Sequence, residues 1–162
     1  IDESNADGHY ILWPKDPYVS AKKWYDWVRK EYGVQDVGIL IVDSHSIPLR
    51  RGTVGISLSH WGFHPLIDYR GTPDLFGRPY KVSLTDIPDG LAGAAVLCMG
   101  EGSETTPLAL ATDLPFVTFS EKPYEATTPY SSFQIPLEED LYYPFFKFPP
   151  WQKGGGGEGG EE

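Results

Sequence analysis

The sequence contains a single cysteine, Cys98, in 162 residues. One cysteine cannot form a disulfide within the chain, and one thiolate cannot assemble a zinc site. Its apolar neighbours in the stretch AAVLCMG favour a buried structural thiol over a nucleophile. The sequence also lacks any run of about 18 apolar residues, so no membrane span is expected. It has no leader of the signal-peptide type, and a cytoplasmic location is therefore expected.

Basic residues are scarce as well. Lys and Arg number 13 against 23 Asp and Glu, which gives a formal net charge of −10. An acidic surface argues against binding along a nucleic-acid backbone, which needs basic stripes. It is compatible with a site that gathers carboxylates around a divalent cation. Hydrophobic residues make up 40% of the chain, so most of it is expected to fold around a core.

The amino-terminal third predicts a helix followed by a strand. Asp16 can cap the first free amides, Pro17 suits the first helical position and Gly33 can end the last turn. Apolar residues at three- and four-residue intervals predict a buried stripe, made of Ala21, Trp24 or Tyr25, Val28 and Tyr32. The stretch VGILIVD, residues 37–43, is apolar without alternation, which predicts a strand covered on both sides. This order indicates an α/β or α+β layer arrangement.

Shorter elements are predicted further along the chain. A short strand is expected around 53–58, turns in 68–80, and an alternating strand in 80–86. The next segment predicts a helix that Thr85 or Asp86 caps and Gly100 ends. Its inward residues are expected to be Leu91, Ala94, Ala95 and Cys98. Two more short strands are expected in 107–112 and 115–119. We expect one domain over 1–150 and a flexible Gly- and Glu-rich tail over 151–162.

Three acidic residues lie near the expected ends of elements. Asp2 is at the start of the chain, Asp43 ends the apolar strand, and Glu101 follows the second helix. Ligand sites in sheet-containing folds gather at such ends, and carboxylate oxygens suit a hard cation such as Mg²⁺ or Mn²⁺. A turn or helix cap is the alternative role for each of these acids.

A Gly-rich loop is the second candidate site. In MGEGSETTP, residues 99–107, the glycines let the backbone approach a phosphate and the hydroxyls can donate to it. The loop does not have the GxxxxGK[ST] pattern and contains no lysine. A helix C-cap followed by a polar loop is the alternative interpretation.

Histidines and arginines offer two weaker candidates. His60 and His64 have the i, i+4 spacing of zinc ligands on one helix face, although Gly62 and Pro65 argue against a helix there. Four arginines near Gly-rich turns could bind phosphate or carboxylate groups, or could satisfy loop carbonyls. These are Arg50, Arg51, Arg70 and Arg78.

Taken in order, IDESN, GILIVDS, PLRRG and DYRGTPDLFGRPYKVSLTDIPDGLAGAAVLCMGEG resemble the γ-glutamyl ligases that act on the deazaflavin coenzyme F-420. The similarity runs from Ile1 to about Val117. It implies an α+β fold, a mixed sheet with packed helices, in which two subunits intertwine as a homodimer. It also implies an enzyme that uses GTP and two divalent cations, Mg²⁺ or Mn²⁺, to join L-glutamate to a carboxylate acceptor.

The resemblance carries specific roles to positions of this sequence. It implies that Asp2 and Asp43 bind one metal ion, that Glu101 helps to hold a second, and that Ser44 also faces the second metal. Asn5 matches the nucleotide-contacting Asn of the family. The implied nucleotide loop is Met99, Gly100, Glu101, Gly102, Ser103, Glu104, Thr105 and Thr106. No catalytic general base is identified.

The sequence also departs from the family. The chain begins at Ile1 without Met, and the family's amino-terminal region has no counterpart in it, so we expect a piece of a longer protein. The stretch ISLSHWGFHPL replaces a small, Gly- and Ala-rich one at a place where an acceptor could dock. The acceptor is therefore expected to be either the deazaflavin precursor or a folate-like molecule. A non-catalytic metabolite-binding or oligomerisation module of the same fold is the alternative function.

Overall fold

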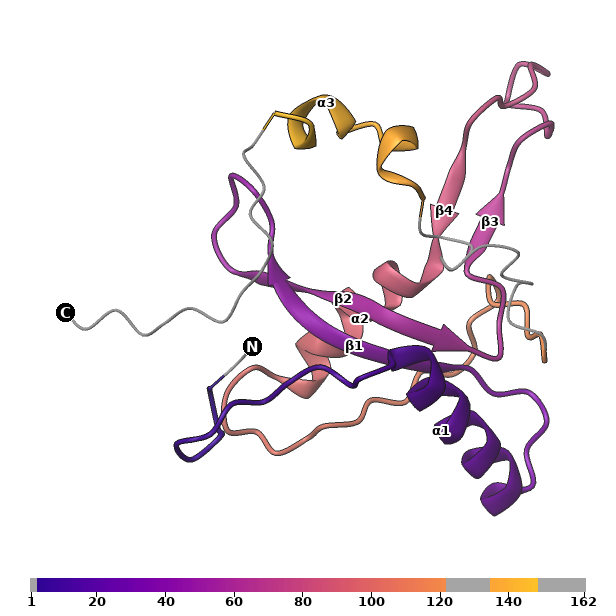
Figure 1. The fold of residues 1–162 in the computed structure, drawn as a ribbon. Helices are drawn as coiled ribbons and strands as arrows, with labels where there is room; N and C mark the ends of the chain where they lie inside the picture. The colour runs from indigo at the N-terminus through magenta and orange to yellow at the C-terminus, as the bar shows by residue number, and fades with distance from the viewer. Residues whose placement is uncertain (1–2, 122–134, 149–162) are drawn as a thin grey trace.

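The computed structural model describes residues 3–121 and 135–148 (Figure 1). Its elements, in chain order, are α1 (Pro17–Tyr32), β1 (Ile39–Ser46), β2 (Thr53–Trp61), β3 (Leu66–Asp68), β4 (Leu84–Asp86), α2 (Ile87–Met99), the 3-10 helix η1 (Leu137–Glu139) and α3 (Tyr143–Phe146). The predicted α+β class is confirmed. Within the described ranges the strands form two antiparallel pairs, β1 with β2 and β3 with β4. The predicted tail, 151–162, lies outside the described residues.

The β1–β2 hairpin is the scaffold on which α1 and α2 pack. Its register pairs Asp43 with Ile56 and Ser44 with Gly55, and it shifts after Ile41. The short strand expected at 53–58 is confirmed and extends to Trp61. β1 is half-buried over its first six residues and exposed at its last two. No residue of β1 is fully buried, so the prediction of a strand covered on both sides is wrong.

Local signals set the ends of α1 as predicted. The Asp16 side chain accepts a hydrogen bond from the Val19 amide at 3.0 Å, and Gly33 adopts φ 65° just after the last turn. Ala21 and Tyr25 are buried on the inner face. Tyr32 was expected in the same stripe but is 68% exposed, because the end of the helix extends beyond the sheet that it packs on (Figure 1).

The outer face of α1 carries the aromatic residues that the hairpin does not cover. Trp24, the alternative to Tyr25 in the predicted stripe, is 48% exposed. Its ring lies edge-on to Trp27 at 5.5 Å between centroids, and Trp27 in turn meets Tyr32 at 5.9 Å. The predicted choice between positions 24 and 25 is therefore settled in favour of Tyr25.

The ends of α2 also agree with prediction, but its inward face does not. Asp86 caps the helix by accepting from the Asp89 amide, and Gly100 follows the last turn. The residues buried along the helix are Ile87, Pro88, Ala92 and Val96. Ala94 and Cys98 are exposed, and Leu91 and Ala95 are half-buried. The predicted buried thiol is therefore wrong.

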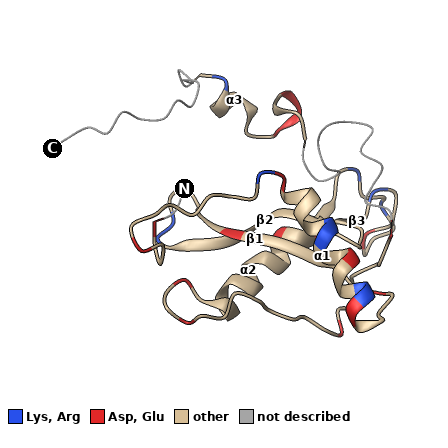
Figure 2. Cartoon of the chain, turned by 60° about the horizontal axis from the view of Figure 1, so that its bottom comes forward, with Lys and Arg blue, Asp and Glu red and all other residues tan. Residues whose placement is uncertain are grey.

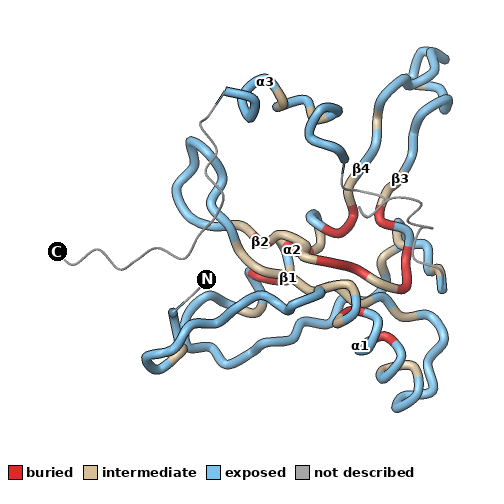
Figure 3. The backbone as a smooth tube through the Cα atoms, viewed as in Figure 1, coloured by how far each residue is buried: buried red, intermediate tan, exposed pale blue. Residues whose placement is uncertain are grey.

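Contact with β2 decides which face of α2 is buried. A Cβ atom at Gly55 would lie 2.2 Å from the Ala92 carbonyl oxygen and 2.7 Å from the Val96 side chain. The backbone of α2 therefore packs directly against Gly55, and Ala92 and Val96, which lie at this contact, are buried. Figure 2 shows that α2 carries no charge beyond its first turn. Figure 3 shows the buried residues gathered along β2, the start of α2 and the inner side of α1.

The segment after α2 forms less regular structure than predicted. No strand is present in 107–112, and in 115–119 a single bridge pairs Phe119 with Phe63. Beside it, the His64 amide donates to the Thr118 carbonyl at 2.9 Å and the Ser120 amide to the Gly62 carbonyl at 2.8 Å. These bonds tie the segment to the end of β2.

Residues 66–86 form an arm that projects from the body beyond β3 and β4 (Figure 1). Only Leu84–Asp86 of the strand predicted at 80–86 is regular. Main-chain bonds continue the pairing outward, including Gly71 to the Tyr80 carbonyl at 2.9 Å. At the tip, Leu75 is 98% and Phe76 81% exposed. The arm therefore presents apolar surface far from the core.

We predict that Gly55→Ala destabilises the chain by about 2 kcal/mol, because the new methyl group would overlap the α2 backbone. Urea unfolding measures this change. Gly90→Ala is the matched control: apart from the backbone of its own helix and its chain neighbours, nothing lies within 4 Å of the added methyl group, and the substitution falls inside α2. It should stabilise by about 0.5–1 kcal/mol, because glycine is a poorer helix former than alanine. Equal stability of Gly55→Ala and the parent chain would contradict this account.

Candidate functional site

The end of β1 and the loop after α2 meet at a hydrogen bond between Ser44 and Glu101. The Ser44 hydroxyl donates to Glu101 Oε2 at 3.0 Å across 57 residues of sequence. The Ser44 amide donates to Asp43 Oδ1 at 2.8 Å. The structure thus brings together Asp43, Ser44 and Glu101, three of the four residues implied to be metal ligands. The fourth, Asp2, lies outside the described residues.

The amino-terminal segment lies against the predicted nucleotide loop. The Asn5 side-chain amide donates to the Gly102 carbonyl at 2.9 Å. Asn5 has φ 57°, a left-handed conformation that asparagine tolerates better than most residues. The loop predicted from sequence and the asparagine predicted to contact the nucleotide are therefore neighbours in space.

Contacts inside the loop over 99–106 hold it in a closed shape. The Gly102 amide donates to Glu104 Oε2 at 2.8 Å, and the Thr106 hydroxyl donates to the Met99 carbonyl at 2.6 Å. Thr105 is left-handed, with φ 56°. Ser103 is exposed beside them. Hydrogen bonds between side chains and main chain within the loop therefore fix its conformation beyond the end of α2.

Sequence reasoning missed one contact of this cluster. The indole N–H of Trp13 donates to Asp43 Oδ2. Trp13 precedes Pro14 in a stretch without periodicity, and nothing in that stretch indicates a contact with a strand 30 residues away. A prediction of this contact would need the path of the chain between Asn5 and α1.

The donor chemistry of the cluster fits a hard divalent cation. Asp43 and Glu101 provide carboxylate oxygens and Ser44 a hydroxyl oxygen, and oxygen ligands are those that Mg²⁺ and Mn²⁺ prefer. Among residues 3–121 and 135–148, no group of three or more His, Cys, Asp or Glu side chains is arranged to hold a metal ion. The described part of the chain contains two carboxylates and a hydroxyl in this cluster, and metal binding by them and by Asp2 stays a prediction.

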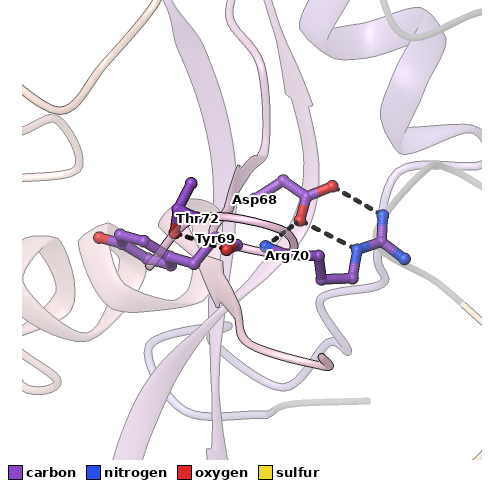
Figure 4. A network of polar contacts seen from close by, with 4 residues as sticks. All are labelled: Asp68, Tyr69, Arg70 and Thr72. Atoms are coloured by element: carbon purple, nitrogen blue, oxygen red, sulfur yellow. Dashed lines mark hydrogen bonds and ion pairs between the residues drawn. The ribbon is translucent and has the colours of Figure 1, made fainter. Parts of the chain in front are cut away.

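The arginines of the arm pair with neighbouring aspartates, and Figure 4 shows the pair of Arg70 and Asp68. Arg70 donates through Nε to Asp68 Oδ1 at 2.9 Å and through Nη2 to Asp68 Oδ2 at 2.7 Å. These bonds hold the pKa of Asp68 at about 2, below its ordinary range. Arg78 donates to Asp74 at 2.9 Å in the same way. Both guanidinium groups are thus paired with aspartates of the arm, whereas Arg50 and Arg51 are exposed in the β1–β2 turn.

The two histidines considered as zinc ligands lie in different surroundings. His60 is buried in β2, with ring centroids 5.9 Å from Tyr18 and 5.3 Å from Phe63. His64 is exposed beyond the end of β2. The pair is not on a helix, and the described residues give it no acidic or cysteine partner for a metal. The zinc hypothesis is therefore wrong for this part of the chain.

A pocket of about 420 Å³ opens at the base of the arm. Its lining comes from three regions of the chain: His64, Leu66, Ile67, Asp68, Tyr69, Ile87, Phe116 and Thr118. Ile87 is at the start of α2, whereas Glu101 follows its end. A helix of this length spans about 20 Å, so the pocket and the Ser44–Glu101 contact lie at opposite ends of α2.

The fold is α+β, and the end of β1, the loop after α2 and the amino-terminal segment meet in one cluster of polar side chains. The family model described as F420-0:Gamma-glutamyl ligase matches residues 1–113, and the chain belongs to this family. The resemblance seen in the sequence is thereby confirmed. No helix in the described part of the chain is long and apolar enough to cross a membrane.

Individual relatives agree with the family match. The chain is 41% identical over 111 residues to a coenzyme F420:L-glutamate ligase of Methanopyrus kandleri, covering 68% of this chain and 44% of that protein. It is 38% identical over 118 residues to that of Methanocaldococcus jannaschii, covering 72% and 47%. A third, from Methanothermobacter thermautotrophicus, is 34% identical over 117 residues. In each comparison the matched segment spans less than half the length of the relative.

We predict that His60 makes stability depend on pH. Burial lowers the pKa of His60 from 6.5 to about 4, so between these values the unfolded chain binds a proton that the folded chain does not. The stability from His60 is complete above pH 6.5 and is lost as the pH falls toward 4. His60→Phe, which keeps a ring beside Tyr18 and Phe63, should remove this loss. Urea unfolding at several pH values in that range measures it.

Asp86 provides the control of opposite sign. Burial raises the pKa of Asp86 to about 6, aided by the nearby Asp89, so its contribution falls as the pH rises from 3.8 through 6. Asp86→Asn keeps a capping side chain but removes this contribution. Its stability should therefore rise more steeply with pH than that of the parent chain, whereas the stability of His60→Phe should rise less steeply. Identical pH profiles for His60→Phe and the parent chain would contradict the assignment.

Proposed function

We propose that this chain is the part of a γ-glutamyl ligase that binds nucleotide phosphates and divalent cations during formation of an amide on L-glutamate. The acceptor is a carboxylate, either the coenzyme F-420 precursor or a folate-like molecule, and GTP is the co-substrate. One observation carries the proposal. Asn5, Ser44 and Glu101, which are far apart in sequence, meet at the Gly102 loop through contacts of 2.9 and 3.0 Å.

The site residues divide into two proposed roles. Asp43, Ser44 and Glu101, with Asp2, would hold Mg²⁺ or Mn²⁺ at two positions. Such cations neutralise charge on phosphoryl oxygens when they are bound. Asn5 and the loop residues from Met99 to Thr106 would position the nucleotide, because exposed amides and hydroxyls of such a loop can donate to phosphate oxygens.

The proposed reaction has two steps, formation of an acyl phosphate and then of the amide. A carboxylate oxygen of the acceptor attacks the γ-phosphorus of GTP, and GDP leaves, giving an acyl phosphate. The glutamate amine then attacks the carbonyl carbon, inorganic phosphate leaves, and the nitrogen loses a proton as the amide forms. A carboxylate is a poor electrophile, so the nucleotide is needed to convert its oxygen into a leaving group. Positioning and charge neutralisation carry most of the rate enhancement in phosphoryl transfer.

We predict that Asp43→Asn lowers ligase turnover by roughly 100-fold or more, because it removes the charge at the strand end and keeps the side-chain shape. Glutamate-dependent phosphate release from GTP, with Mn²⁺ and each acceptor, is the measurement. Asp36→Asn changes the same charge at an exposed position between α1 and β1 and should leave turnover unchanged. Unchanged turnover in Asp43→Asn would contradict the metal assignment.

A non-catalytic binding module is the second candidate, and the coverage of the relatives favours it. The matched segment is 44% to 47% of the first two relatives, so residues needed for turnover can lie in the part without a counterpart here. Calorimetric titration of the chain with GTP and Mn²⁺ separates the two functions. Binding without turnover supports the module, and the absence of both binding and turnover contradicts both functions.

We also propose a homodimer in which the arm over 66–86 contacts a second copy of the chain. The support is the exposed apolar tip, since Leu75 and Phe76 lie on a projecting hairpin rather than on the core.

We predict that Phe76→Asp converts the dimer into a monomer in analytical ultracentrifugation. Leu110→Asp, at a residue 90% exposed in the segment after α2, should leave the dimer intact. A dimer that survives Phe76→Asp would contradict this role of the arm.

A further inference from the structure

We propose that Trp13 is a positioning residue whose indole N–H orients the carboxylate of Asp43 toward a divalent cation. The proposal rests on the proposed function and adds to it a residue that neither the sequence motifs nor the family match points to. The observation is the hydrogen bond from Trp13 Nε1 to Asp43 Oδ2, which joins the segment before α1 to the end of β1.

The two oxygens of Asp43 have different donors. Oδ1 accepts from the Ser44 amide at 2.8 Å, and Oδ2 accepts from the Trp13 indole. A carboxylate has about four lone-pair positions, so each oxygen keeps one for another partner. With both oxygens bonded, the plane of the carboxylate is set, and the remaining lone pairs point in defined directions. Hydrogen bonds of this kind orient metal-binding carboxylates.

The type of donor matters as much as its position. An indole N–H is a neutral donor that does not accept or lose a proton in the ordinary pH range. A Lys or Arg at the same place would neutralise Asp43 and repel a cation. Trp13 therefore fixes the carboxylate and leaves its negative charge available. Asn5 and Ser44, the other side-chain donors of the cluster, are neutral as well.

The surroundings of Trp13 argue against a purely structural role. Its side chain is 59% exposed, and its neighbours Tyr10, Ile11 and Leu12 are each more than half exposed. Burial of the indole in the core therefore does not explain its position. The segment is anchored on both sides, by Asn5 on Gly102 and by the Ser59 hydroxyl, which donates to the Pro17 carbonyl at 2.8 Å. Between these anchors, the indole reaches the strand end.

Mn²⁺ alone is the probe in the binding test, which uses the whole 162-residue chain. Calorimetry should show Mn²⁺ affinity lowered about 10-fold or more in Trp13→Phe, which removes the N–H and keeps a ring. Trp24→Phe changes an exposed tryptophan on the outer face of α1 and should leave the affinity unchanged. Equal affinity in Trp13→Phe and the parent chain would overturn the proposal.

The indole N–H resonances in ¹⁵N NMR spectra report the Trp13–Asp43 hydrogen bond itself, independently of the Mn²⁺ affinity that tests its positioning role. In the metal-free chain, Asp43→Asn should shift the Trp13 resonance and leave those of Trp24 and Trp27 in place. Substoichiometric Mn²⁺ should broaden the Trp13 resonance before those two. This measurement stands even where Trp13→Phe fails to fold.

The outcomes separate this proposal from the proposed function. A Trp13 resonance that does not respond to Asp43→Asn, in a chain that binds Mn²⁺, overturns the role of Trp13 and leaves the cation site standing. A parent chain that binds no Mn²⁺ overturns both. A shifted resonance together with weakened Mn²⁺ binding in Trp13→Phe supports both.

Discussion

The structure depends on the close approach of α2 to β2 at Gly55. A side chain there would overlap the Ala92 carbonyl, so the absence of one sets the distance between helix and hairpin. In the hairpin register, Gly55 is the direct partner of Ser44. The carboxyl end of α2, a few residues beyond Val96, is therefore brought over Ser44, and Glu101 comes within hydrogen-bonding distance of its hydroxyl at 3.0 Å. The packing of one glycine thus places the candidate site.

The candidate site combines acidic groups with neutral donors. The chain has a formal net charge of −10, and the cluster contains Asp43 and Glu101, whose charges repel each other. Neutral N–H and O–H groups from Trp13, Ser44 and Asn5 organise this cluster without cancelling the negative charge that a cation would meet. Two of the four arginines considered as anion ligands, Arg70 and Arg78, pair instead with aspartates of the arm. This separation of charges agrees with a cation site on an acidic protein.

The core of the described chain is small, and much apolar surface lies outside it. The buried hydrophobic residues are Ala21, Tyr25, Phe63, Ile87, Ala92 and Val96. Against these stand exposed apolar groups at the tip of the arm and aromatic rings on the outer face of α1. Exposed apolar patches are characteristic of interaction surfaces, and the homodimer proposed above would cover the patch at the tip of the arm. The segment shared with the first two relatives is 44% and 47% of their length.

The sequence by itself determined the features that depend on near neighbours. The caps at Asp16, Gly33, Asp86 and Gly100 were predictable because each acts on amides or carbonyls within one helical turn. The order of α1, β1, β2, β4 and α2, and the family, followed from motifs that are contiguous in the chain.

Only the tertiary structure decided which faces became buried and which distant side chains met. The inner face of α2 runs through Ala92 and Val96 and leaves Cys98 exposed. Because α2 has apolar residues on every side, its contact with β2 at Gly55 determines which side is buried. The contact of Trp13 with Asp43 spans 30 residues and has no local signal. Local hydrogen bonds are specified by spacing along the chain, whereas packing depends on the shapes of surfaces that come together only when the chain folds.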